Sequence, residues 1–170
     1  MRVHVSINAE SKGGGSNTFA ALFSRYIKES AHQEVSDMAT ADLAVVIAHR
    51  ADEGLLVDAK ARGCVILHRL DEYFEQDESA ARREKHEKIR ALNRLADVTI
   101  YQSEFVFENV HPFLNPSRYE IVRNGGDPQR FKPGRRPGSL IGHVSWGIDT
   151  KKRLDVVHEV KTPFGGRHSR

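Results

Sequence analysis

An unbroken run of five apolar residues at 43–47 limits what this chain can fold into more than any other stretch. A strand with one face in water alternates apolar and polar residues, whereas a run without alternation indicates a strand covered on both faces. Strands of that kind belong to parallel sheets with helices packed on each side. A second such run occupies residues 64–67. The sequence therefore predicts an α/β fold.

Helical and strand patterns alternate along the chain, which is typical of a parallel sheet built from βαβ units. Apolar residues at three- and four-residue spacing in the first helix predict its core face, which comprises Phe19, Leu22, Phe23, Tyr26 and Ile27. We expect a Rossmann-like open parallel sheet with helices on both faces. The predicted strands are residues 3–7, 43–47, 64–67, 98–101 and 119–122, with a short edge strand at 35–38, and the predicted helices are 17–30, 52–62, 79–95 and 104–110, before Pro112 breaks the chain.

Three consecutive glycines, Gly13, Gly14 and Gly15, lie between the first strand and the first helix. Glycines let the backbone turn tightly, and the free amides at a helix start favour an anion, usually a phosphate. Ser16 or Asn17 is predicted to cap this helix, because a short side-chain oxygen can accept from the first-turn amides. The spacing matches neither of the common nucleotide-binding glycine patterns, so a turn without a ligand is the alternative.

Polar residues follow the strand at residues 64–67, where His68, Arg69 and Asp71 come in close succession. In open parallel sheets, ligands bind at the carboxyl ends of the strands. We therefore expect a ligand role for at least one of these three side chains. The alternative is a local ion pair between Arg69 and Asp71. Further along the chain, Ser103 is a candidate cap for the helix at 104–110.

Composition excludes several classes of protein. A formal charge of +3 over 170 residues is too small to argue for nucleic-acid binding. The single cysteine, Cys64, excludes an internal disulfide framework and fits a reducing cytosol, and its place in an apolar run predicts a buried, inert thiol. No signal peptide or membrane-spanning run is expected, so the predicted location is cytoplasmic. Basic residues between 123 and 136 suit a phosphorylated ligand or an anionic membrane surface, with a solvated face as the alternative.

The chain divides into three parts by composition. Residues 1–128 form the predicted Rossmann-like domain, and the Pro-, Gly- and Arg-rich residues 129–138 are predicted to be a linker. Residues 139–170 begin a second unit, in which Lys151 and Lys152 precede an amphipathic helix at 154–160. One strand and one helix cannot bury a core alone, so this second domain is predicted to be incomplete.

Four stretches together resemble the amino-terminal half of a known enzyme family. They are the glycine loop at 12–18, the strand-end motif at 68–71, the passage from 95 to 105, and residues 122–127 with Phe131 and Pro133. This order resembles retaining glycosyltransferases of the large group-one family, which have the GT-B fold of two Rossmann-like domains. The last stretch carries the most specific motif, although Gly126 stands where the family usually has valine.

The resemblance implies transfer of a sugar from a nucleotide-diphosphate sugar to an acceptor that the sequence does not name, with retention of configuration. It places the donor diphosphate against Gly13 to Gly15 on one side and Lys151 or Lys152 on the other. His68 and Asp71 would line the acceptor side near the reacting carbon as candidate catalytic residues, with Arg69 and Ser103 also on the acceptor side. No metal or other cofactor is implied.

The departures from the family pattern concern the second domain. The Glu-x7-Glu motif of the family is absent, and Trp146 and Gly147 stand where an arginine usually precedes the lysine. The chain is therefore expected to be a fragment of a longer enzyme or a truncated product. The alternatives are a non-catalytic, flavodoxin-like module that binds a phosphate-bearing ligand or a protein, and an inactive product that merely folds.

Overall fold

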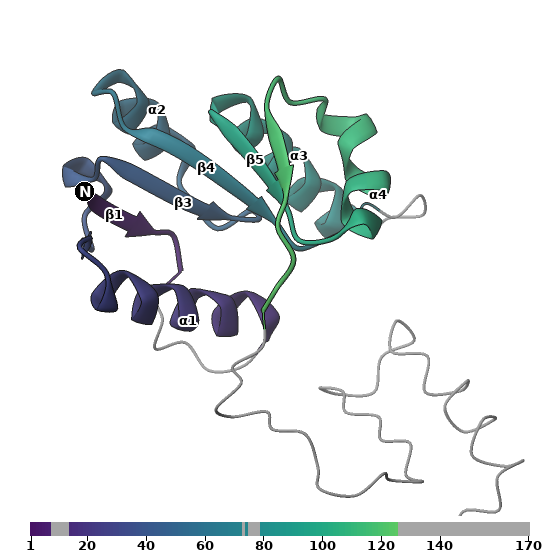
Figure 1. The fold of residues 1–170 in the computed structure, drawn as a ribbon. Helices are drawn as coiled ribbons and strands as arrows, with labels where there is room; N and C mark the ends of the chain where they lie inside the picture. Colours follow the sequence, from purple (N-terminus) through teal and green to yellow (C-terminus); the bar gives the residue numbers. More distant parts are fainter. Residues whose placement is uncertain (8–13, 73, 75–78, 126–170) are drawn as a thin grey trace, which may run out of the picture. The chain divides into compact units, whose positions relative to one another are not determined.

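Six strands lie side by side in one parallel sheet in the computed structural model, which describes residues 1–7, 14–72, 74 and 79–125 (Figure 1). Their order is β2-β1-β3-β4-β5-β6, and every neighbouring pair is parallel. The strands are β1 (Arg2–Val5), β2 (Gln33–Glu34), β3 (Leu43–Ile47), β4 (Val65–Leu70), β5 (Val98–Tyr101) and β6 (Tyr119–Ile121).

Helices cover both faces of this sheet. Helix α1 packs on one face against β1 and β3, and helices α2, α3 and α4 pack on the other (Figure 1). The predicted Rossmann-like α/β fold is thereby confirmed. The helices are α1 (Gly15–Glu29), α2 (Glu53–Ala61), α3 (Ala80–Leu95) and α4 (Glu104–Leu114), with a short 3-10 turn, η1 (Met38–Thr40).

Strand β3 is buried on both faces, which explains its unbroken apolar sequence. Val45 and Ile47 pack into the cluster beneath α1, whereas Ala44 and Val46 pack beneath α2 and α3. Successive side chains of a strand point to opposite faces, so each face of β3 needs apolar residues. Cys64 is a free thiol buried in the core cluster that also contains Ala44 and Val46, and burial raises its pKa.

Several elements differ from the sequence-based prediction. The edge strand is Gln33–Glu34 rather than 35–38, and Tyr26, expected in the core, is exposed. Helix α4 continues through Pro112 to Leu114 and ends at Asn115 in a left-handed conformation. Proline removes one backbone donor and crowds the preceding turn. Here Val106 and Val110 before the proline are buried, and Leu114 after it packs against the same core cluster.

The carboxyl edge of the sheet contains a topological switch point. The chain passes from β1 to β2 at one edge of the sheet. It then crosses back, and β3 pairs with β1 on the side opposite β2. A crevice at the carboxyl ends of two such strands is where open α/β sheets bind ligands. Met1–Gly125 forms one compact unit around this sheet. The predicted linker at 129–138 and the unit predicted at 139–170 lie outside the described residues.

Candidate functional site

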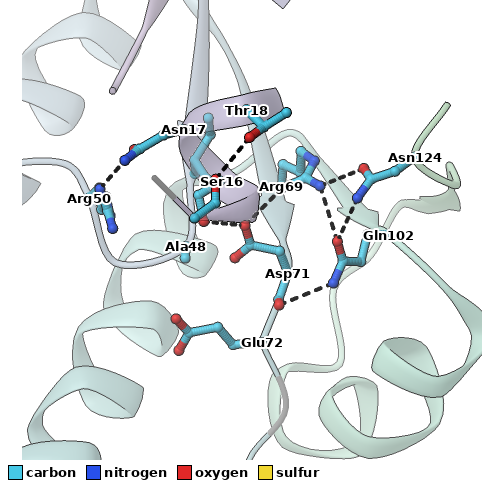
Figure 2. Close-up of polar contacts among 12 residues, drawn as sticks. Ser16, Asn17, Thr18, Ala48, Arg50, Arg69, Asp71, Glu72, Gln102 and Asn124 are labelled. Carbon is cyan, nitrogen blue, oxygen red and sulfur yellow. Dashed lines mark hydrogen bonds and ion pairs between the residues drawn. The ribbon is translucent and has the colours of Figure 1, made fainter. Parts of the chain in front are cut away.

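Five segments reach the carboxyl edge of the sheet, because all six strands run in the same direction. The start of α1 follows β1, and residues 48–50 follow β3. Asp71 follows β4, Gln102 follows β5, and Asn124 follows β6. Figure 2 shows polar side chains from these segments pointing toward one another. This group of residues is the candidate site.

Helix α1 begins at Gly15, two residues before the predicted start at residue 17, so the last of the three glycines belongs to the helix. Gly14 is the N-cap residue with φ 84°, a conformation that costs glycine little, and its carbonyl accepts from the Thr18 amide at 3.1 Å. Neither Ser16 nor Asn17 caps the helix, since its start has no side-chain cap. The Ser16 hydroxyl instead donates to Asp71 Oδ2 at 2.5 Å, and Asn17 Oδ1 accepts from Arg50 Nη1 at 3.3 Å (Figure 2).

Arg69 is the centre of the polar network. Its side chain is 3 % exposed, and its guanidinium lies 3.9 Å from the centroid of the Phe19 ring of α1. Nη1 donates to Asp71 Oδ2 at 3.1 Å, and Nη2 donates to Asn124 Oδ1 at 2.8 Å and Gln102 Oε1 at 3.2 Å. Burial lowers the pKa of Arg69, and Asp71 opposes that shift. The planar donor fork thus joins α1 to the ends of β4, β5 and β6.

Asp71 is held by groups on three elements but keeps one oxygen unused. Oδ2 accepts from Ser16 and Arg69, and the Asp71 carbonyl accepts from Gln102 Nε2 at 3.1 Å. The side chain is 8 % exposed, and Oδ1 is buried with no hydrogen-bond partner among the described residues. A buried carboxylate oxygen without a partner costs free energy, so this atom is a candidate acceptor for a ligand.

His68 lies in the core rather than at the sheet edge. The prediction ended the strand at residue 67, but β4 continues to Leu70, and strand alternation turns His68 toward α3 while Arg69 faces α1. Its Nδ1 accepts from Asn93 at 3.0 Å, so Nε2 carries the hydrogen and donates to the Ala48 carbonyl at 2.8 Å. Burial lowers the pKa of His68 to about 4, so the ring is neutral. The structure does not bring His68 to the acceptor side beside Asp71.

The contacts of His68 hold an unusual turn after β3. Ala48 has φ 49°, in the left-handed region that side chains other than glycine rarely adopt. Its amide donates to the Arg69 carbonyl at 2.9 Å while its carbonyl accepts from His68. Both backbone groups of Ala48 are therefore fixed by β4. This turn leads to Arg50, whose side chain reaches the first turn of α1.

The remaining predicted site residues lie elsewhere or outside the description. Ser103 is the N-cap of α4, where its hydroxyl accepts from the Val106 amide at 3.2 Å, as its predicted capping role requires. Arg123, the first of the basic residues predicted to meet a membrane or phosphate, pairs with Glu104. Gly13, Lys151 and Lys152 lie outside the described residues.

Three residues of the network were not singled out from the sequence. Arg50, Gln102 and Asn124 each directly or closely follow a strand, and that position was the available signal. To predict that these three residues lie close together, the strand ends would have had to be combined with the order of the strands in the sheet. Arg50 adds a second guanidinium near the start of α1.

No helix in the described part of the chain is long and apolar enough to cross a membrane. Among those same residues, no group of three or more histidine, cysteine, aspartate or glutamate side chains could hold a metal ion. Comparisons with protein-family models, with curated proteins and with solved structures give no match in any of the three.

Proposed function

We propose that Met1–Gly125 is the acceptor-side domain of a glycosyltransferase that uses a nucleotide-diphosphate sugar and retains the configuration of the transferred sugar. The observation that carries the proposal is the Asp71 carboxylate at the carboxyl edge: Ser16 and Arg69 fix Oδ2, and Oδ1 has no partner within residues 1–7, 14–72, 74 and 79–125. The motif order that resembles the group-one family gives the reaction class. The free Cys64 thiol fits the proposed cytosolic location.

Asp71 has the central role in this proposal. Its Oδ1 would accept a hydrogen bond from the acceptor hydroxyl and orient that oxygen toward the reacting carbon of the donor. Orientation of two substrates can supply a large part of the rate enhancement, on the order of 7–11 kcal/mol in well-aligned reactions. Arg69 is a positioning residue, because its Nη1 fixes the carboxylate while its own side chain is only 3 % exposed. His68 positions the turn at Ala48.

A transfer assay with the full 170-residue chain tests this function, because that chain includes Lys151 and Lys152, which the family resemblance places on the donor side. The chain is incubated with UDP-, GDP- and ADP-linked hexoses and a panel of hydroxylated acceptors, and release of nucleoside diphosphate is measured. We expect release from at least one donor, stimulated by at least one acceptor and reduced at least about 100-fold in Asp71→Asn. Asp58→Asn, on the exposed side of α2, is the matched control and should retain the rate.

The second candidate is a flavodoxin-like module that binds a phosphate-bearing ligand without turnover. The strand order favours it, since β2-β1-β3-β4-β5 is the order of flavodoxin-like sheets. Phosphate-ligand binding with no nucleotide release from any donor would select this module and overturn the transferase.

A further inference from the structure

The start of α1 offers two different chemistries to a ligand. Asp71 Oδ1 is buried and has no hydrogen-bond partner in the part of the chain that the structure describes, so it can accept from a donor such as a hydroxyl group. The amides of Gly15 and Ser16 lie in the first turn of α1, where the helix itself offers no acceptor and the N-cap Gly14 has no side chain to cap them, so an acceptor oxygen suits them. Figure 2 shows the Asp71 carboxylate pointing toward Ser16 in this first turn. A ligand that satisfies both sides therefore carries a hydroxyl group and an acceptor oxygen.

The local charges favour an anion for the acceptor part. Arg50 contacts Asn17 in the first turn, Arg69 lies against Asp71, and the amino end of α1 contributes about +0.5 of a charge. The Asp71 carboxylate opposes these two guanidinium groups. The nearby Glu72 is paired with Lys85. The edge is positive on balance despite Asp71.

We infer that this edge binds a sugar phosphate or polyol phosphate. A hydroxyl of the ligand donates to Asp71 Oδ1, and its phosphate is held by Arg50 and the amides of Gly15 and Ser16. Phosphate is the anion that a helix amino terminus most often binds. The inference rests on the proposed function, because it names the class of the sugar acceptor.

This assignment differs from the sequence-based prediction that the glycines hold the donor diphosphate. A diphosphate group would place its charge beside the Asp71 carboxylate and would offer Oδ1 no hydroxyl donor. A sugar phosphate separates its negative charge from its hydroxyl groups. Each part can then meet the group that complements it.

Isothermal titration calorimetry on the 170-residue chain measures the inferred specificity. The probes are glucose 6-phosphate, glycerol 3-phosphate, glucose, inorganic phosphate and pyrophosphate. We expect at least one of the two phosphorylated alcohols to bind at least about tenfold more tightly than glucose and than inorganic phosphate, since one added charge-assisted hydrogen bond changes affinity by about that factor. Equal binding of that compound and inorganic phosphate would overturn the inference.

Two variants separate the two halves of the site. Arg50→Gln is expected to remove most of the preference for the phosphorylated alcohol over glucose. Asp71→Asn is expected to remove most of its preference over inorganic phosphate. Arg62→Gln and Asp58→Asn, both on exposed parts of α2 and its C-cap, are the matched controls and should bind as the unmodified chain does. If Asp71→Asn fails to fold, Ser16→Ala replaces it, with an expected loss of about threefold to tenfold for the phosphorylated alcohol.

The outcomes separate this inference from the proposed function. If pyrophosphate binds more tightly than every other probe, and Asp71→Asn leaves that affinity unchanged, the site binds the donor diphosphate. That result would overturn this inference but not the proposed function. Transfer to neutral sugars without any preference for phosphorylated acceptors would likewise overturn this inference and leave the proposed function standing. The predicted sugar-phosphate specificity without nucleotide release in the transfer assay would overturn the proposed function and leave the phosphate site standing.

Discussion

Ala48 joins the core to the candidate site through its backbone. Its φ of 49° places it in a region that costs an L-residue roughly 1–2 kcal/mol, and hydrogen bonds from β4 hold it there. Strained residues of this kind persist where the surrounding structure determines them, often at ligand sites. The position after β3, at the switch point of the sheet, fits that pattern.

Ala48→Gly is expected to change the free energy of unfolding by less than about 1 kcal/mol. The relief of left-handed strain offsets the lost methyl group and the greater chain entropy of glycine. Ala59→Gly makes the same chemical change in helix α2, at another fully buried alanine, where no strain is relieved. It should cost about 2 kcal/mol. Urea unfolding of both variants measures the difference, and equal costs would contradict the role of strain at Ala48.

His68 predicts a pH dependence of stability. Its pKa is about 4 in the folded protein because of burial, against 6.5 ordinarily. Between these values the unfolded chain binds a proton at His68 and the folded protein does not. The neutral, buried His68 therefore adds its full contribution to the free energy of unfolding above pH 6.5. That contribution, about 3 kcal/mol, is lost as the pH falls from 6.5 to 4.

Urea unfolding at a series of pH values from 7 to 4 measures this slope. In His68→Gln, whose amide can still donate to the Ala48 carbonyl, stability should fall less steeply over that range than in the unmodified chain. His32→Gln, at an exposed position directly before β2, is the control and should keep the full slope. A slope that His68→Gln leaves unchanged would show that another group titrates.

At the scale of elements, strand ends decide which residues reach the site. The sequence placed β3 and β5 correctly, because polar residues follow both strands closely, at His49 and Gln102. It ended β4 three residues early, because His68 and Arg69 are polar and read as a loop. Both are buried and hydrogen-bonded in the structure. Apolar patterning cannot identify a polar strand residue whose partners lie on other elements.

Helix α4 depends on the cap that the sequence did identify. Ser103→Ala is expected to lower the free energy of unfolding by about 1 kcal/mol, since the Val106 amide loses its acceptor. Ser103→Asp should retain most of that stability, and Ser117→Ala, at an exposed position before β6, should stay within about 0.5 kcal/mol. Thermal unfolding measures all three. A loss of sugar-phosphate binding in Ser103→Ala at full stability would instead support its predicted acceptor-side role.

At the scale of the whole unit, the sequence predicted the sheet but not the convergence at its edge. Arg69 and Asp71 were singled out because they follow a buried strand. Their partners Ser16, Gln102 and Asn124 come from three other segments, up to 55 residues away along the chain. The partners of a given side chain depend on the strand order, which a single sequence does not specify. The unpartnered Asp71 oxygen likewise follows only from coordinates.

Arg69 is expected to contribute more to the unit's stability than any exposed ion pair does. Arg69→Met leaves Asp71 buried without its cation and removes the donors to Gln102 and Asn124, so the free energy of unfolding should fall by about 3–5 kcal/mol. Arg2→Met breaks the ion pair with Asp42, whose two side chains are 51 % and 43 % exposed, and should cost less than about 1 kcal/mol.

A double-mutant cycle identifies the source of that loss. If the uncompensated carboxylate dominates, Arg69→Met with Asp71→Asn should cost at least about 1 kcal/mol less than the two single costs added together, because the neutral amide no longer needs a buried cation. Additive costs would show that Arg69 acts through its stacking on Phe19 and its amide partners instead. Urea unfolding at pH 7 of the four chains gives the coupling directly. A cost for Arg69→Met as small as that for Arg2→Met would show that the network does not hold the carboxyl edge together, and the fixed geometry proposed for Asp71 would then lose its support.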